Sequence, residues 1–138
     1  PVLCDSRMVC EGVIRAKLPA ENEVLCWNNC PESAVLAKEL ETTRSAAAVD
    51  LWRPKLAGAV VAVGNSPTAL FRLLEVLEEG VDPPAVIFGL PVGFVGAAES
   101  KELLVKQCKE SVQFLTLNGR RGGSAMAAAA VNALTVDG

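Results

Sequence analysis

The sequence contains no histidine, and this absence bears on what the chain can catalyse. Histidine is the commonest general acid or base near neutral pH. Neither a Ser-His-Asp triad nor a Cys-His pair can be assembled from these 138 residues. We therefore do not expect nucleophilic hydrolase chemistry from them alone.

Long apolar runs are also missing. No run approaches the roughly 20 residues that a membrane-spanning helix needs, and the first residues lack the basic region and apolar stretch of a signal peptide. We expect a cytoplasmic protein without a membrane partner. Pro1 is not an initiator Met, and an apolar run follows it directly, so we expect the C-terminal part of a longer chain.

An excess of positive charge is absent as well. The net charge is −3, so no field over the whole molecule attracts nucleic acid, and none is expected as a partner. Any anion site must be local. The glycine-rich loops match neither GxxxxGK[ST] nor GxGxxG, which weakens a nucleotide-binding interpretation.

The five cysteines are odd in number and lie in apolar context, which favours reduced thiols over a disulfide framework. Cys26 and Cys30 could form half of a metal site. Because a second cysteine pair and histidine are both absent, we predict no metal site.

Apolar periodicity predicts a repeated strand-helix unit. An unbroken apolar run over 57–63 is typical of a strand buried on both faces, and an amphipathic helix follows over 68–79. The unit recurs as a strand over 85–90 with a helix over 97–108. A third copy has a strand over 112–117 and an alanine-rich helix from Ser124.

The first part of the chain fits the same plan. We expect a strand over 1–4 with a short helix behind it, a strand over 24–26, and helical sequence from Ser33 to about Trp52. This predicts a single domain over residues 1–138. Its fold class is α/β, a doubly wound, mostly parallel sheet with helices on both faces, a three-layer arrangement of the flavodoxin-like or Rossmann-like kind.

Four strand-to-helix loops should meet at the carboxyl edge of this sheet, where such folds bind ligands. They cover 4–6, 64–68, 91–100 and 118–124. Ser66 and Ser124 are predicted N-caps, and the helix N-termini favour an anion. Arg120 and Arg121 could make bidentate contacts to a carboxylate or phosphate.

Each feature also has a purely structural interpretation. Serine caps and loop glycines occur throughout α/β proteins, and Arg44 could form a surface ion pair. The alanine-rich helix suits a packed neighbour, a subunit interface or a flat ligand. Glu99, in the first turn of a helix, is more simply a complement to the helix dipole than a catalytic acid.

Six stretches closely resemble the precorrin-8X methylmutase family, the precorrin isomerases of cobalamin (vitamin B12) biosynthesis. They are PVLCDSRMVCEGV, LPAENEVLC, TRSAAAVDLW, GAVVAVGNSPTALFRLLE, PVGFVGAAESKELL and GRRGGSAMAAAAVNAL, and together they cover nearly the whole chain.

The resemblance implies a homodimeric α/β isomerase that moves a methyl group from C-11 to C-12 of a corrin precursor. Its substrate would be precorrin-8X, giving hydrogenobyrinic acid, or a cobalt-precorrin-8 type tetrapyrrole, giving cobyrinic acid. No separate cofactor is implied. The many carboxylates of such a substrate would suit a rim of helix N-termini and arginines.

The resemblance also implies where the chemistry lies. The family's catalytic histidine belongs to a segment upstream of Pro1, so no catalytic residue is predicted within these residues. Arg44 is expected to bind a substrate carboxylate. The full set of predicted substrate-binding residues is Asp5, Arg44, Ser45, Asn65, Ser66, Thr68, Gly93, Phe94, Val95, Arg120, Arg121, Gly122, Gly123 and Ser124.

Two departures from the family pattern stand out. Glu41-Thr42 replaces a common Gly-Asn, and Ile14 replaces a common hydroxyl residue, so the turn before Arg44 and the active site could differ. Two other functions stay open. One is a non-catalytic tetrapyrrole-binding module, and the other is a flavodoxin-like mononucleotide-binding protein.

Overall fold

The computed structural model describes residues 1–18, 22–93, 95–119 and 121–134. In this part of the chain, five parallel strands form one sheet in the order β2-β1-β3-β4-β5. The strands are β1 (Val2–Cys4), β2 (Val24–Leu25), β3 (Val60–Val63), β4 (Val86–Gly89) and β5 (Gln113–Thr116). The α-helices are α1 (Arg7–Gly12), α2 (Pro31–Glu39), α3 (Arg44–Leu51), α4 (Pro67–Glu78), α5 (Ala97–Cys108) and α6 (Ser124–Ala133).

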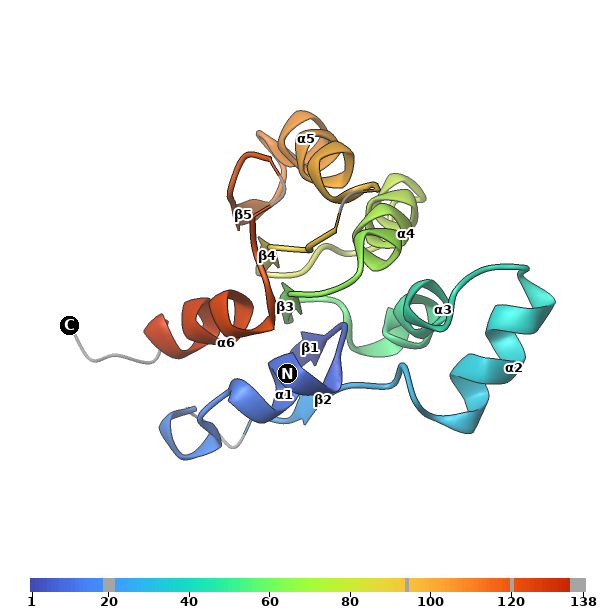
Figure 1. The fold of residues 1–138 in the computed structure, drawn as a ribbon, viewed down its shortest axis with the longest axis horizontal. Helices are drawn as coiled ribbons and strands as arrows, with labels where there is room; N and C mark the ends of the chain where they lie inside the picture. Colours follow the sequence, from blue (N-terminus) through green and yellow to red (C-terminus); the bar gives the residue numbers. More distant parts are fainter. Residues whose placement is uncertain (19–21, 94, 120, 135–138) are drawn as a thin grey trace.

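The helices form layers on both faces of the sheet, which confirms the predicted doubly wound fold (Figure 1). Helices α1 and α6 pack together on one face, whereas α3, α4 and α5 cover the other. Helix α2 packs against α3 and lies outermost. Each face has its own core, represented by Val9, Phe88 and Val131 on the first and by Leu70 and Ile87 on the second.

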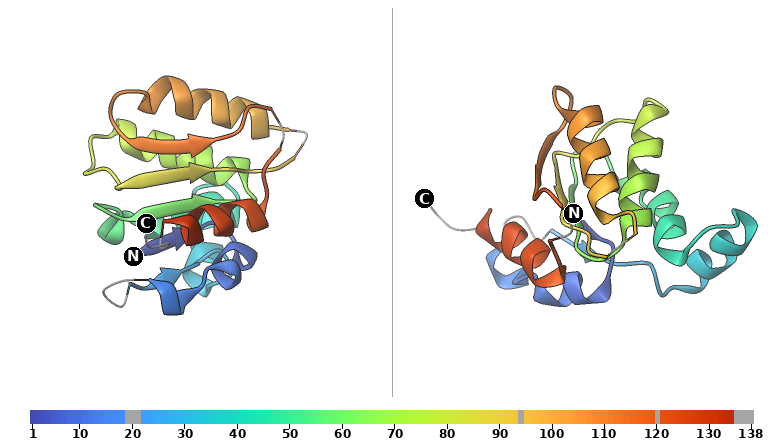
Figure 2. Two further views of the ribbon diagram at one scale, coloured as in Figure 1. Left: turned by 90° about the vertical axis from the view of Figure 1, so that its left-hand side faces the viewer. Right: turned by 45° about the horizontal axis from the view of Figure 1, so that its top comes forward.

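The strand order reverses direction between β1 and β3, because the chain adds β2 on one side of β1 and the later strands on the other. In an open parallel sheet, ligands bind outside the carboxyl ends of the strands at such a point. The left view of Figure 2 shows the strands running the same way, with the loops toward the helices gathered beyond the arrowheads. We call this edge of the molecule the carboxyl rim.

Helix α4 begins and ends where its sequence predicts. The Ser66 side chain accepts a hydrogen bond from Ala69 N, and Pro67 takes the first helical position. The apolar face meets the sheet through Leu70, Leu73 and Leu74, among other buried residues. Gly80 follows the helix with φ 88°, a left-handed conformation that glycine adopts at little cost.

The stretch expected to be helical from Ser33 to about Trp52 contains two helices rather than one. It divides into α2 and α3, because Glu41 turns the chain with φ 53°. Thr43 then starts α3 by accepting a hydrogen bond from Ala46 N. The predicted start of the strand over 57–63 is wrong. Strand β3 begins at Val60, after a turn in which Gly58 has φ 73°.

The alanine-rich helix α6 uses its small side chains for close packing. A Cβ added at Gly12 of α1 would lie 2.7 Å from Ala128 Cβ, and one at Gly64 would lie 2.9 Å from Ala127 Cβ. Helix α6 therefore sits directly on α1 and on the end of β3. The opposite side of the helix is apolar and open to solvent, with Met126 and Leu134 exposed.

No helix within the described ranges is long and apolar enough to span a membrane. The cysteines are free thiols, as predicted. Burial raises the pKa of Cys4, Cys26 and Cys108, so these side chains serve as neutral core groups.

Candidate functional site

Five helices, α1, α3, α4, α5 and α6, begin at the carboxyl rim or beside it. Side chains cap three of them, through Ser6, Thr43 and Ser66. Glycine precedes the other two, Gly96 with φ 88° and Gly123 with φ 127°. Because the first N–H groups of a helix have no partner within it, and the dipole is positive there, this edge favours anions.

Asp5 lies at the end of β1 with 1% of its surface exposed, and it holds the next loop of the rim. One carboxylate oxygen accepts the N–H of Gly64 at 2.8 Å. The other accepts Asn65 N at 3.0 Å and Ser66 N at 2.6 Å. Burial raises the pKa of Asp5, against the lowering effect of these hydrogen bonds. Both oxygens thus have partners within the protein, an arrangement that positions the loop over 64–66.

Hydroxyl groups join two helix starts on one side of the rim. Thr68 Oγ1 lies 2.8 Å from Ser66 Oγ and 2.8 Å from Thr43 Oγ1, which links the caps of α4 and α3. Arg44 follows Thr43 directly and is exposed, and within the described ranges it makes no ion pair. The next residue, Ser45, is half-buried.

Ser124 does not cap α6, so that expectation is wrong. The N-cap position belongs to Gly123, and Ser124 is the first helical residue. Its Oγ lies 3.3 Å from Ser6 Oγ, and this contact connects the starts of α1 and α6. The serine is therefore at the rim, as predicted, in a different role.

The loop between β4 and α5 follows β4 at the carboxyl rim. Val92 N donates to Asn65 O at 3.3 Å, which ties this loop to the loop held by Asp5. Gly93 is exposed and has φ 129°, and Val95 is 90% exposed, so both are accessible to a ligand. Phe94, another predicted contact, lies outside the described residues.

The loop between β5 and α6 is held from beneath by Lys101, a residue that the sequence reasoning missed. Its Nζ donates to Gly119 O at 3.1 Å and to Arg121 O. Lys101 is 2% exposed, and burial lowers its pKa. A signal was available, because Lys101 shares the buried face of α5 with Leu104 and Cys108.

The same loop also packs tightly against β4. Gly123 N donates to Leu90 O at 2.9 Å, and Gly122 lies so close to the backbone of Leu90 and Pro91 that it leaves no room for a Cβ. Arg121 is exposed. Arg120 falls outside the described residues. The structure thus places the predicted glycines at the rim, where Gly122 permits close packing and Gly123 adopts a positive φ.

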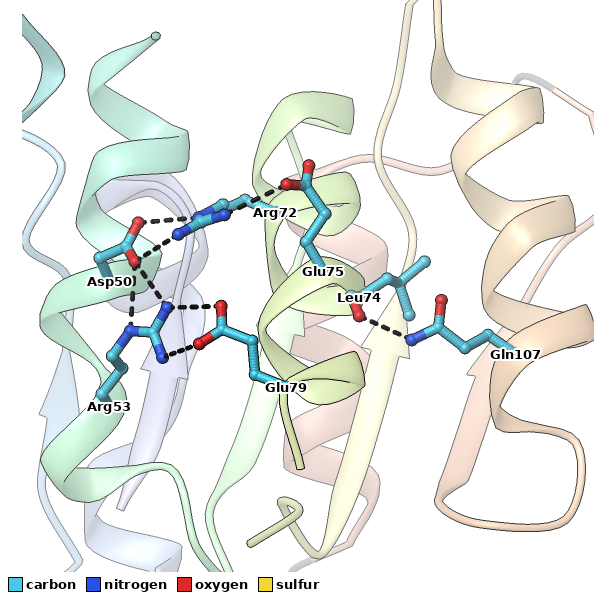
Figure 3. Close-up of polar contacts among 7 residues, drawn as sticks. All are labelled: Asp50, Arg53, Arg72, Leu74, Glu75, Glu79 and Gln107. Atoms are coloured by element: carbon cyan, nitrogen blue, oxygen red, sulfur yellow. Dashed lines mark hydrogen bonds and ion pairs between the residues drawn. The ribbon is translucent and has the colours of Figure 1, made fainter. Parts of the chain in front are cut away.

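An ionic network joins α3 to α4 away from these loops (Figure 3). Asp50 accepts hydrogen bonds from Arg72 at 2.8 Å and from Arg53 at 3.0 Å, and the two arginines also pair with Glu75 and Glu79. Burial alone would raise the pKa of Asp50, but the two guanidinium groups outweigh it and the pKa is lowered. These charges satisfy one another, so the network is structural.

The described residues hold no group of three or more side chains that could bind a metal ion. Cys26 donates to Asn28 Oδ1 at 3.0 Å, and Cys30 donates to Trp27 O at 3.0 Å. The thiols that resembled half of a metal site therefore have protein partners.

The rim combines anion-binding groups with apolar ones. Met8 and Met126 lie in the first turns of α1 and α6 and are 75% and 44% exposed, with Val95 on the loop between β4 and α5. At the rim, the buried carboxylate of Asp5 already accepts hydrogen bonds from backbone N–H groups, whereas the side chain of Glu99 is exposed. The arrangement combines apolar contact with groups that attract anions, which suits a ligand that carries both.

Comparison with known proteins identifies the family to which this chain is similar. Residues 1–136 match the family model described as precorrin-8X methylmutase. A precorrin-8X methylmutase of Pseudomonas aeruginosa is 57% identical over 136 residues, covering 99% of this chain and 65% of the relative. One from Sinorhizobium sp is 56% identical, covering 100% of this chain and 65% of the relative. The chain thus spans less than two thirds of the length of either relative.

Two solved structures share the fold. One, a precorrin-8X methylmutase related protein, has a TM-score of 0.87 and 35% identity, covering 97% of this chain and 69% of that one. The other, a precorrin-8x methyl mutase from Thermus thermophilus, has a TM-score of 0.83 and 36% identity, covering 97% of this chain and 64% of that one.

Proposed function

This chain belongs to the precorrin-8X methylmutase family, and we propose that it serves the corresponding isomerisation as part of the complete protein. The reaction is the migration of a methyl group from C-11 to C-12 of precorrin-8X, giving hydrogenobyrinic acid. A cobalt-containing substrate, giving cobyrinic acid, is the variant suggested by relatives named cobalt-precorrin-8 methylmutase. The match of the family model over residues 1–136 carries the proposal.

The geometry of the rim supports a tetrapyrrole substrate. Helix N-termini and the exposed Arg44 and Arg121 complement carboxylates, since guanidinium groups bind them in a bidentate manner. The exposed side chains of Met8, Val95 and Met126 offer apolar contact to a flat ring. A mononucleotide would satisfy the anion-binding groups but would need no such apolar border.

Within this proposal, these residues bind and orient the substrate. They include no histidine, so the proton donor that the resemblance implies is supplied by residues outside these 138. Orientation alone contributes to catalysis, because a macrocycle held by several carboxylates presents the migrating methyl group and the donor in one fixed geometry. No separate cofactor takes part.

We also propose that the protein functions as a homodimer in the cytoplasm. Leu134 at the C-terminal end of α6, Leu115 of β5 and the following Leu117 are exposed. A helix that is apolar on all sides ordinarily has a partner on each of them. A second copy would cover this surface.

The test is an assay of ring-methyl migration with the complete natural protein and, separately, with the 138-residue chain. Conversion by the complete protein and binding without turnover by the short chain are expected. Turnover by the short chain would contradict the placement of the proton donor. Tight product binding by the complete protein without turnover would favour a non-catalytic tetrapyrrole-binding module. A thermal shift with flavin or nucleotide would favour a flavodoxin-like mononucleotide-binding protein.

A further inference from the structure

Lys101 is buried, yet it has no carboxylate partner among the described residues. An ammonium group removed from water is costly unless hydrogen bonds compensate it. The compensation comes from two backbone carbonyls, those of Gly119 and Arg121. A buried cation thus binds the backbone of the loop between β5 and α6, the segment of the rim that carries Arg121.

The position of Lys101 in α5 explains how it reaches this loop. It is the fifth residue of the helix, and long side chains on a helix extend back toward its N-terminus. Helix α5 begins at the rim, so the side chain of Lys101 runs beneath the rim and meets the loop from inside. Leu104, one turn further along, is buried against Gly89 in the core and has no part in the loop.

The contact with Arg121 O sets the direction of a peptide group. In a trans peptide, the C=O and the following N–H point in opposite directions, and none of the described peptides is cis. When Arg121 O turns inward to the ammonium, the N–H of Gly122 turns outward. No described residue accepts a hydrogen bond from that N–H. Gly123 N, by contrast, is already used by Leu90 O.

We propose that Lys101 is a positioning residue for substrate binding: its ammonium holds the backbone at Gly119 and Arg121 so that Gly122 N–H and the Arg121 side chain face an anionic group of the ligand. This inference rests on the proposed function for the identity of that group, a tetrapyrrole carboxylate. The lysine itself does not touch the ligand. It acts through the two carbonyls that it binds.

The experiment compares Lys101→Met with Leu104→Ala in the complete natural protein, with precorrin-8X as the substrate. Methionine keeps the length and apolar stem of lysine but removes its donors. We expect KM to rise about tenfold, the loss of roughly one ligand hydrogen bond, with kcat within about twofold of wild type. Amide hydrogen exchange should accelerate at 121–123 and remain unchanged in the β1–β3–β4 core. Leu104→Ala should lower the melting temperature and leave KM unchanged.

Lys101→Gln supplies the graded control, because its amide can donate to one of the two carbonyls and should give an intermediate KM. An unchanged KM in Lys101→Met, or an equal rise in Leu104→Ala, would overturn the proposal. If the methionine variant does not fold, an unchanged KM in Lys101→Gln would do the same. If the wild-type protein neither binds nor converts precorrin-8X, the proposed function fails instead. Amide hydrogen exchange at residues 121–123 then still tests whether Lys101 holds this loop.

Discussion

Two loops of the carboxyl rim are held by buried charges of opposite sign. The loop over 64–66 is held by the carboxylate of Asp5, which accepts hydrogen bonds from backbone N–H groups. The loop between β5 and α6 is held at Gly119 and Arg121 by the ammonium of Lys101, which donates to their backbone carbonyls. Both residues are almost fully buried.

The difference decides what each loop can offer a ligand. Asp5 uses the N–H groups of Gly64, Asn65 and Ser66, so these backbone groups are not available to a ligand. Lys101 uses carbonyls and leaves the N–H of Gly122 facing outward. We therefore expect the second loop to be the better site for an anion.

The largest effect on stability is expected from Asp5→Ala, which would break the first loop. It leaves one buried and two partly buried N–H groups without an acceptor. At about 1 kcal/mol each, this should lower the free energy of unfolding by about 3 kcal/mol in urea titrations. Asp5→Asn keeps one acceptor oxygen and should lose about half as much. A loss below about 1 kcal/mol for Asp5→Ala would show that the carboxylate does not hold this loop.

The second effect tests the packing of the other loop. Gly122→Ala places a methyl group against the backbone of Leu90 and should cost about 2 kcal/mol, within the usual range for overpacking. It should also weaken substrate binding. The matched variant is Gly119→Ala, where φ is 83° but the space is open, so only backbone strain of about 1 kcal/mol is expected. Equal losses in the two variants would mean that contact with Leu90 is unimportant.

The smallest effect belongs to a region outside both loops, the ionic network of α3 and α4. Asp50→Asn should lower the free energy of unfolding by about 1 kcal/mol at neutral pH, since the charges are partly exposed, and should leave ligand affinity unchanged. A changed affinity would extend the binding site beyond the rim.

This variant also has a pH signature. The folded pKa of Asp50 is lowered, so its stabilisation is present above the unfolded value, about 3.9, and is lost as pH falls through the folded value. The difference between wild type and Asp50→Asn in urea titrations should therefore be constant above about pH 5 and shrink below about pH 4. If the stability difference between wild type and Asp50→Asn persists in acid, the charge of Asp50 is not its cause.

Much of the fold could be predicted because local patterns encode it. Unbroken apolar runs indicated the buried strands, and the amphipathic pattern and the Ser66 cap indicated α4. The division of α2 from α3 could not be predicted in the same way. It depends on a left-handed Glu41, a conformation rare for that residue, which the packing of α2 against α3 supports.

The sequence by itself determined the α/β fold, the glycines and small residues at the rim, and the family to which they belong, because these are properties of residue type and spacing. Only the tertiary structure decided which polar groups the rim uses internally. Asp5 meets partners 59 to 61 residues away, and Lys101 meets carbonyls 18 and 20 residues away. Such pairs follow from strand order and loop paths, which no local pattern specifies.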